Sequence, residues 1–200
     1  MTRPPGWRGP GVLDTEAGLV ARARAGDMDA FEQLAGAHAD RLFALLLRLL
    51  GDRAEAEDVA QEVMLRAWRG LGRFHGQSLF FTWLYRIAVN EANRSLEKSS
   101  RRPAFVPIDA DVVQVPSAAW DQPSRRLEQA ELREALSQAL ADLAPDHRAA
   151  IVLRDVEGLS TQEAAQITGI GQAAFKSRLH QARLQVRAAI GDDALINADQ

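Results

Sequence analysis

The residues best suited to a chemical task lie near the C-terminus, where residues 171–190 contain Lys176, Arg178, Arg183 and Arg187 and no acid. The segment therefore has a net charge of +4. Ammonium and guanidinium groups bind phosphate, and arginine also donates paired hydrogen bonds to guanine. The pattern favours recognition of nucleic acid. The alternative is a helical hairpin with a solvated basic face.

The elements that must position these cations have a helix-turn-helix layout. Ser160 followed by Glu163 predicts a capping box at the start of a first helix. Gly169 is suited to a left-handed helix end, and the second helix begins after Gly171. In a helix-turn-helix the second helix enters the major groove of DNA. The apolar residues expected to pack the two helices together are Leu159, Ala164, Ile167, Ile170, Phe175 and Leu179.

A second basic stretch, residues 66–102, combines cations with aromatic side chains. Eight basic residues against Glu91 and Glu97 give a net charge of +6. Its aromatic residues are Trp68, Phe74, Phe80, Phe81, Trp83 and Tyr85. Basic and aromatic side chains together are typical of surfaces that hold single-stranded DNA. A helical core explains most of these rings, so we expect Trp68 and Trp83 to be largely buried and Phe81 and His75 to lie near a loop surface.

An acidic patch precedes this stretch. Asp58, Gln61 and Glu62 share one face of a predicted helix that starts near Asp52. Acids near a helix N-terminus are stabilised by the helix dipole, so a solvated face explains them. Docking to a basic protein partner is the other interpretation. Leu65 is expected to point inward on this helix.

Composition excludes several classes of function. The 200 residues carry a net charge of −3 and no cysteine, which rules out disulfides and thiolate metal sites. No apolar stretch is long enough to cross a membrane and no secretion signal is present, so we expect a cytoplasmic protein without membrane insertion. The four histidines are scattered, and neither a phosphate-binding glycine loop nor a Ser-His-Asp set is found. We therefore expect no catalytic residues, metal, cofactor or small-molecule substrate.

The hydrophobic pattern predicts an all-α chain of two small helical domains joined by a flexible linker. We expect a disordered leader over residues 1–14, a first domain over 15–100 and a second over 125–192, followed by a tail over 193–200. The linker, residues 101–124, contains four prolines and three aspartates. In the second domain we expect helices over residues 127–143 and 151–156, with Pro145 as a helix-start proline.

Five motifs together resemble a known family. They are EDVAQEV at 57–63, RAW at 66–68, FHGQS at 74–78, TWLYRIAVN at 82–90 and KSRLHQAR at 176–183. In this order they resemble the extracytoplasmic-function (ECF, group 4) sigma factors of the bacterial sigma-70 family. The resemblance covers about residues 25–100 and 125–190. It implies a sigma-2-like helical bundle followed by a sigma-4-like helix-turn-helix domain.

The resemblance also implies partners and site residues. The partners would be core RNA polymerase (its beta and beta-prime subunits), promoter DNA and an anti-sigma protein. Core polymerase would contact Asp58, Gln61, Glu62 and Arg66. The −10 promoter element would be recognised and opened by Arg73, His75, Gln77, Ser78, Arg86, Asn90 and Arg94. The −35 element would be contacted by Ser160, Thr161, Gln172, Lys176, Ser177, Arg178, His180 and Arg183.

Two departures from the family pattern affect DNA recognition. Ala173 and Ala174 stand in the predicted recognition helix and cannot hydrogen-bond to base edges. Base recognition there would depend mainly on Gln172, Lys176 and Arg178. Phe81 stands where the family commonly has a basic or polar residue. A stand-alone helix-turn-helix regulator is the main alternative function, and a protein that binds only other proteins is a third.

Overall fold

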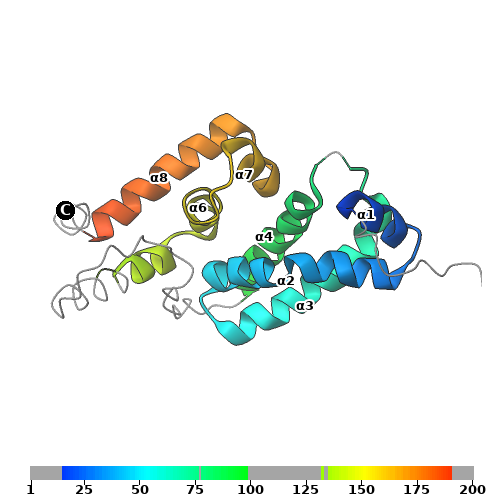
Figure 1. Ribbon diagram of the computed structural model, residues 1–200. Helices are drawn as coiled ribbons and strands as arrows, with labels where there is room; N and C mark the ends of the chain where they lie inside the picture. The colour runs from blue at the N-terminus through cyan, green and yellow to red at the C-terminus, as the bar shows by residue number, and fades with distance from the viewer. Residues whose placement is uncertain (1–14, 77, 99–131, 133–134, 191–200) are drawn as a thin grey trace, which may run out of the picture.

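The computed structural model describes residues 15–76, 78–98, 132 and 135–190, and every regular element among them is helical. Figure 1 shows α1 to α4 on one side and α6 to α8 on the other. The all-α prediction is confirmed. The expected leader, linker and tail lie outside the described residues. None of the described helices has the length and apolar character needed to span a membrane.

The first two helices are α1 (Glu16–Arg24) and α2 (Met28–Leu50), and a side-chain cap starts each. Asp27 accepts a hydrogen bond from the amide of Ala30 (3.1 Å) and another from Arg22 (2.8 Å). The Ala30 amide and then Arg22 lower the pKa of the Asp27 carboxyl. Gly51 ends α2 in the left-handed region, with φ 73°.

Next come α3 (Arg53–Gly70), the short 3-10 turn η1 (Leu71–Arg73) and α4 (Phe80–Lys98). The buried face of α3 contains Ala56, Val59, Val63 and Ala67. The prediction that Leu65 points inward is wrong, because two residues beyond Val63 its side chain lies on the far side of the helix and is 50% exposed.

The two tryptophans, which were predicted to be largely buried, both pack against the core. Trp68 is half-buried against the core and packs on Phe31 with ring centroids 5.2 Å apart. Trp83 is also half-buried, 5.2 Å from the ring of Phe74 and 5.7 Å from that of Phe80. Both rings therefore close the edge of the core, where a large ring can keep one side in water.

The C-terminal part contains a helix over residues 135–142, then α6 (Pro145–Ile151), a π-helical turn η2 (Val152–Val156), α7 (Thr161–Thr168) and α8 (Gln172–Ile190). Pro145 occupies the first turn of α6, as predicted. We call α1–α4 the N-terminal unit and residues 135–190 the C-terminal unit.

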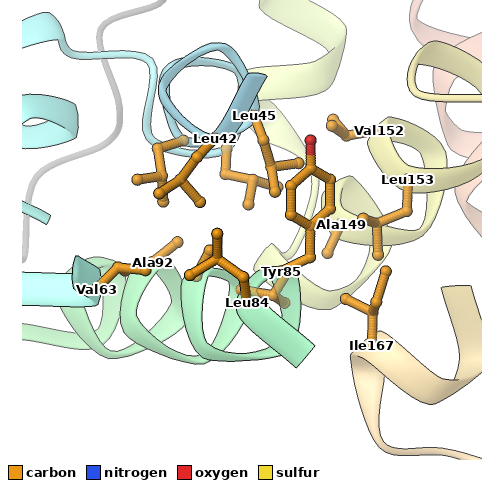
Figure 2. Close-up of a cluster of buried hydrophobic side chains, with 14 of the residues drawn as sticks. Leu42, Leu45, Val63, Leu84, Tyr85, Ala92, Ala149, Val152, Leu153 and Ile167 are labelled. Atoms are coloured by element: carbon orange, nitrogen blue, oxygen red, sulfur yellow. The ribbon is translucent and has the colours of Figure 1, made fainter. Parts of the chain in front are cut away.

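The two units share one hydrophobic core. Helix α4 packs against α6 and α7, and α2 packs against α6 and η2. Figure 2 shows the Tyr85 ring of α4 lying between Leu45 of α2 and a group of residues from the C-terminal unit. Those labelled there are Ala149, Val152, Leu153 and Ile167, all buried. The units therefore bury apolar surface against each other, which stabilises their association.

A buried arginine adds a polar contact between the units. The side chain of Arg148 in α6 donates hydrogen bonds to the carbonyls of Leu140 (2.9 Å), Ala141 (2.7 Å) and Leu143 (3.2 Å). It also donates to the carbonyl of Leu49 in α2, at 2.6 Å. One guanidinium thus donates hydrogen bonds to carbonyls at the ends of two helices, one helix in each unit.

Candidate nucleic-acid and protein interfaces

The helix-turn-helix has the predicted caps. The Ser160 hydroxyl accepts a hydrogen bond from the Glu163 amide (3.2 Å), and the Glu163 carboxylate accepts from the Ser160 amide (2.9 Å) and hydroxyl (2.6 Å). The hydroxyl, then the amide, of Ser160 lowers the pKa of Glu163. Gly169 ends α7 in the left-handed region, with φ 71°. These caps fix where α7 begins and where it ends.

Helix α8 has one buried face and one exposed face. Phe175, Leu179 and Ala182, at spacings of four and three residues, are buried. Five of the residues expected to contact the −35 element are exposed on α8: Gln172, Lys176, Ser177, His180 and Arg183. Ala173 and Ala174 are exposed among them. The second helix therefore presents a broad polar and cationic surface.

Two arginines of α8 are paired with acids of the same unit. Arg178 lies 3.0 Å from a carboxylate oxygen of Asp146 and is half-buried. Arg183 forms a two-pronged pair with Asp155, with N–O distances of 2.9 and 2.5 Å. Hydrogen bonding to this carboxylate raises the pKa of Arg183. A DNA phosphate at either site would replace a carboxylate.

The two other residues expected at the −35 element lie at the start of α7. Ser160 is exposed, but both its hydroxyl and its amide are used in the capping box. Thr161 is half-buried. The amides at this end of α7 lie where a helix dipole favours an anion such as phosphate.

Helix α4 presents a polar ladder. Arg86, Asn90 and Arg94 follow one another at four-residue spacing and are all exposed. Arg94 is held by Glu91, with an N–O distance of 2.6 Å. These three residues, expected at the −10 element, therefore share one face that can follow a DNA strand.

The loop before α4 carries the other residues expected at the −10 element. Arg73 and His75 are exposed, Ser78 is half-buried, and Gln77 lies outside the described residues. Phe74 is buried against Phe80 and Trp83 and so anchors the start of the loop. Leu79, which the sequence did not single out, is 59% exposed.

The residues expected to contact polymerase lie together on α3. Asp58, Gln61 and Arg66 are exposed and Glu62 is half-buried. Arg66 pairs with Glu62 at 2.6 Å and with the buried Glu91 of α4 at 3.1 Å. The exposed Leu65 lies on this helix beside Arg66, so the face combines acids with an apolar side chain.

Sequence reasoning missed the residues that join the two units: Arg148, Asp146 and Glu157. All three are ordinary charged residues in amphipathic helices or turns. Their partners lie far away in the sequence, as for Arg48 and Glu157, which are 109 residues apart. Only for Arg148 was there a local signal, a lone cation before the apolar run 149–153. Among the described residues, no group of three or more acids or histidines could hold a metal ion.

Comparison with known proteins matches both units to one family. The Sigma-70 region 2 model matches residues 34–102, and the Sigma-70 region 4 model matches residues 133–186. The RNA polymerase sigma-H factor of Pseudomonas aeruginosa is 36% identical, over 86% of this chain and 92% of its own. The ECF RNA polymerase sigma-E factor of Escherichia coli K12 is 34% identical, over 84% of this chain and 91% of its own.

Two solved structures are similar to the fold. One is CnrH in complex with the cytosolic domain of CnrY, with a TM-score of 0.60, 28% identity and coverage of 91% of this chain and 97% of that chain. The other is the sigma factor RpoE in complex with the anti-sigma factor NepR from Bartonella quintana. It has a TM-score of 0.57 and 28% identity, over 82% of this chain and 98% of that chain. The two units thus define a bipartite helical sigma architecture. The chain belongs to the ECF sigma factors of the sigma-70 family and is an RNA polymerase sigma factor.

Proposed function

We propose that this chain docks on core RNA polymerase through α3, opens the −10 element with α4 and its preceding loop, and recognises the −35 element with α8. It acts in the cytoplasm, has no catalytic activity of its own, and is silenced by an anti-sigma protein, as the complexes of its structural relatives suggest. The observation that carries the proposal is the presence of three separate exposed faces in one chain. One is acidic, and two carry cations.

The α3 face suits a basic protein surface. Asp58 and Gln61 are exposed one helical turn apart, and Arg66 is drawn toward Glu62 and Glu91 by its ion pairs. Within the described residues Asp58 makes no hydrogen bond or ion pair, so its exposed carboxylate is available to a cationic partner. Complementary charge guides encounter and fixes the register of two surfaces.

The α4 face and its loop suit a strand of opened DNA. Arg86 and Arg94 can follow the phosphates while Asn90 lies between them, and this electrostatic attraction does not depend on sequence. His75 and Leu79 project from the loop, where a ring or an apolar side chain can contact an unstacked base.

The α8 face suits the major groove. Gln172 and Lys176 are exposed at its N-terminal end, the part of a recognition helix that contacts base edges. The methyl groups of Ala173 and Ala174 can contact only the methyl group of thymine. We therefore expect α8 to select its DNA sequence through few hydrogen bonds and to bind the −35 element weakly by itself. Attachment to polymerase should compensate by raising the effective concentration of α8 at the promoter.

Core binding is tested with Asp58→Arg. Reversing this exposed charge should weaken affinity for core polymerase by about tenfold, because a like charge would then face the basic partner. Glu32→Arg is the matched control, since Glu32 is also exposed but lies on α2. Core affinity is measured by fluorescence titration at low salt. An unchanged affinity of Asp58→Arg would remove the docking assignment. Failure of the wild-type chain to bind core would favour the stand-alone regulator.

The −35 assignment is tested with Arg178→Ala in run-off transcription. Loss of one base or phosphate contact should reduce transcription from a −35-containing promoter by about tenfold. Transcription from a template that lacks the element should not change further. Equal loss on both templates would show that Arg178 acts elsewhere.

A further inference from the structure

Glu91 is a buried acid on α4, the helix assigned to the −10 element, and none of the three proposed interfaces uses it. It follows the exposed Asn90, and as a whole residue it is only 8% exposed. A carboxylate with so little access to water is costly unless cations of the protein replace the lost hydration. The cations that pair with Glu91 therefore decide how this part of α4 can meet an anionic strand.

Two arginines from different helices share one oxygen of this carboxylate. Arg66 of α3 and Arg94 of α4 each bring Nη1 to Oε1 of Glu91, at 3.1 Å and 2.6 Å. The Nε of Arg66 also donates to Oε1 of Glu62, at 2.6 Å. These four side chains form a row that runs from α3 to α4 and contains two acids and two cations, so it has no net charge. We call Glu62, Arg66, Glu91 and Arg94 the ion row.

The two arginines of the ion row differ in how firmly they are held. Arg66 pairs with two acids, Glu62 and Glu91, and its side chain is 42% exposed. Within the described residues Arg94 pairs with Glu91 alone, and its side chain is 56% exposed. Arg94 also lies one helical turn after Asn90 on the exposed face of α4. It is therefore the member of the row that a DNA phosphate can take.

A phosphate that binds Arg94 takes away one of the two counter-ions of Glu91. If Arg94 were the only cation there, its departure would leave a buried anion beside the anionic DNA strand, and the two negative charges would repel each other. Arg66 prevents this, because it stays on the same carboxylate oxygen and neutralises it. With Arg66 in place, Arg94 can give its positive charge to the DNA. Without Arg66, Arg94 would have to remain the counter-ion of Glu91.

We infer that Glu91 and Arg66 are positioning residues for −10 DNA, which act through Arg94, and that Arg66 is not a polymerase contact. The family resemblance implies that Arg66 contacts polymerase, but acids of this chain already occupy its Nε and Nη1. Although it lies on α3, Arg66 therefore serves the DNA-facing side of α4. The inference rests on the proposed function, in which Arg94 follows a DNA strand.

The test measures how holoenzyme, formed with saturating core polymerase, binds a forked DNA whose −10 segment is single-stranded. Arg66→Gln should weaken binding about fivefold and reduce the steepness of log K against log salt by about 0.7, the value of one phosphate on a single strand. Arg66→Lys keeps the cation and should bind nearly as well as the wild type. Arg69→Gln is the matched control, since Arg69 is exposed on the same helix and makes no hydrogen bond or ion pair within the described residues. It should leave the salt dependence unchanged.

The decisive variant combines Arg66→Gln with Glu91→Gln. A neutral glutamine at position 91 needs no counter-ion, so Arg94 is released and the second substitution should restore both the affinity and the salt dependence. Ser95→Ala controls for a looser contact between α3 and α4, because it removes the Ser95–Glu55 hydrogen bond (2.6 Å) without touching the ion row. Since the double variant buries no unpaired charge, it decides the matter even if Arg66→Gln alone does not fold. Wild-type binding by the double variant supports the inference, and weak binding overturns it.

Two further measurements separate this inference from the proposed function. In a titration with core polymerase, Arg66→Gln should keep the wild-type affinity that Asp58→Arg loses. A loss of core affinity in Arg66→Gln that Glu91→Gln does not restore would make Arg66 a polymerase contact and overturn the inference. Arg94→Gln should weaken binding to the forked DNA as much as Arg66→Gln does. If Arg94→Gln binds like the wild type, the assignment of α4 to the −10 element is wrong and the inference falls with it. If Arg94→Gln weakens binding and Arg66→Gln does not, only the inference is wrong.

Discussion

Arg148 is the buried charge on which the stability of the C-terminal unit should depend most. Arg148 is 3% exposed, and its guanidinium donates to four carbonyl groups, three at the end of the helix over residues 135–142 and one at the end of α2. Burial lowers the pKa of Arg148, which shows that desolvation opposes its charge. The question is whether four hydrogen bonds outweigh that cost.

Arg148→Met keeps an unbranched stem and removes the donors. A buried acceptor left without a partner costs about 1–3 kcal/mol, but carbonyls at a helix end regain part of this from water. Removing the charge also recovers its desolvation cost. We therefore expect a net loss of about 3 kcal/mol in the free energy of unfolding, which corresponds to a fall of roughly 10 °C in Tm for a chain of this size.

The measurement is urea unfolding followed by circular dichroism. Arg154→Met is the matched control, since Arg154 makes no hydrogen bond or ion pair within the described residues and the change should stay within about 0.5 kcal/mol. Arg148→Lys should lose most of the stabilisation, because one ammonium cannot supply the forked donors. If Arg148→Met were as stable as the wild type, the hydrogen bonds would only offset the desolvation cost and this reasoning would be wrong.

Three further predictions concern caps and charges. Gly169→Ala should destabilise the protein by about 1 kcal/mol, because φ at this position is 71°. Gly36 also lies in open space but is inside α2, so Gly36→Ala should stabilise the protein by about 0.5–1 kcal/mol. Thermal melts of the two variants should therefore show Tm shifts of opposite sign. Glu163→Gln should cost stability at neutral pH. Because the pKa of Glu163 is lowered from its ordinary value of 4.5, the ionised carboxylate stabilises the fold fully above about pH 4.5, and this stabilisation is lost as the pH falls through the lowered pKa. The Tm values of the wild type and of Glu163→Gln should therefore converge in acid. Asp155→Asn should raise the affinity of the free chain for non-specific DNA about threefold by releasing Arg183, and anisotropy showing no change would contradict this.

The sequence predicted features that depend on local chemistry. Ser160 with Glu163, Gly169 and Pro145 each mark a helix end through interactions within a few residues, and the structure confirms all three. The family motifs predicted the two units, because each motif lies within one helix or one loop. The site residues themselves stay predictions, although the structure leaves most of those it describes exposed.

The rest could not be predicted because it depends on contacts between distant parts of the chain. Periodicity alone placed Leu65 inward, but the partners of α3 cover only its Val59–Val63 side. Nothing near Glu157 in the sequence indicates Arg48 as its partner, and a helical pattern does not show whether two units associate. Charge pairs of this kind become visible only when the helices are packed.

The ion pairs also bear on how an acidic chain could carry the proposed DNA-binding faces. In the C-terminal unit, Asp146 neutralises Arg178 and Asp155 neutralises Arg183. The chain therefore pairs two of the cations proposed to face DNA with its own carboxylates, which should reduce binding to arbitrary DNA. If these arginines contact a promoter, each phosphate must displace a carboxylate, so the net gain for each contact should be small. We therefore expect such a chain to bind DNA weakly alone and firmly only when polymerase holds both units beside their elements, because tethering raises the effective concentration.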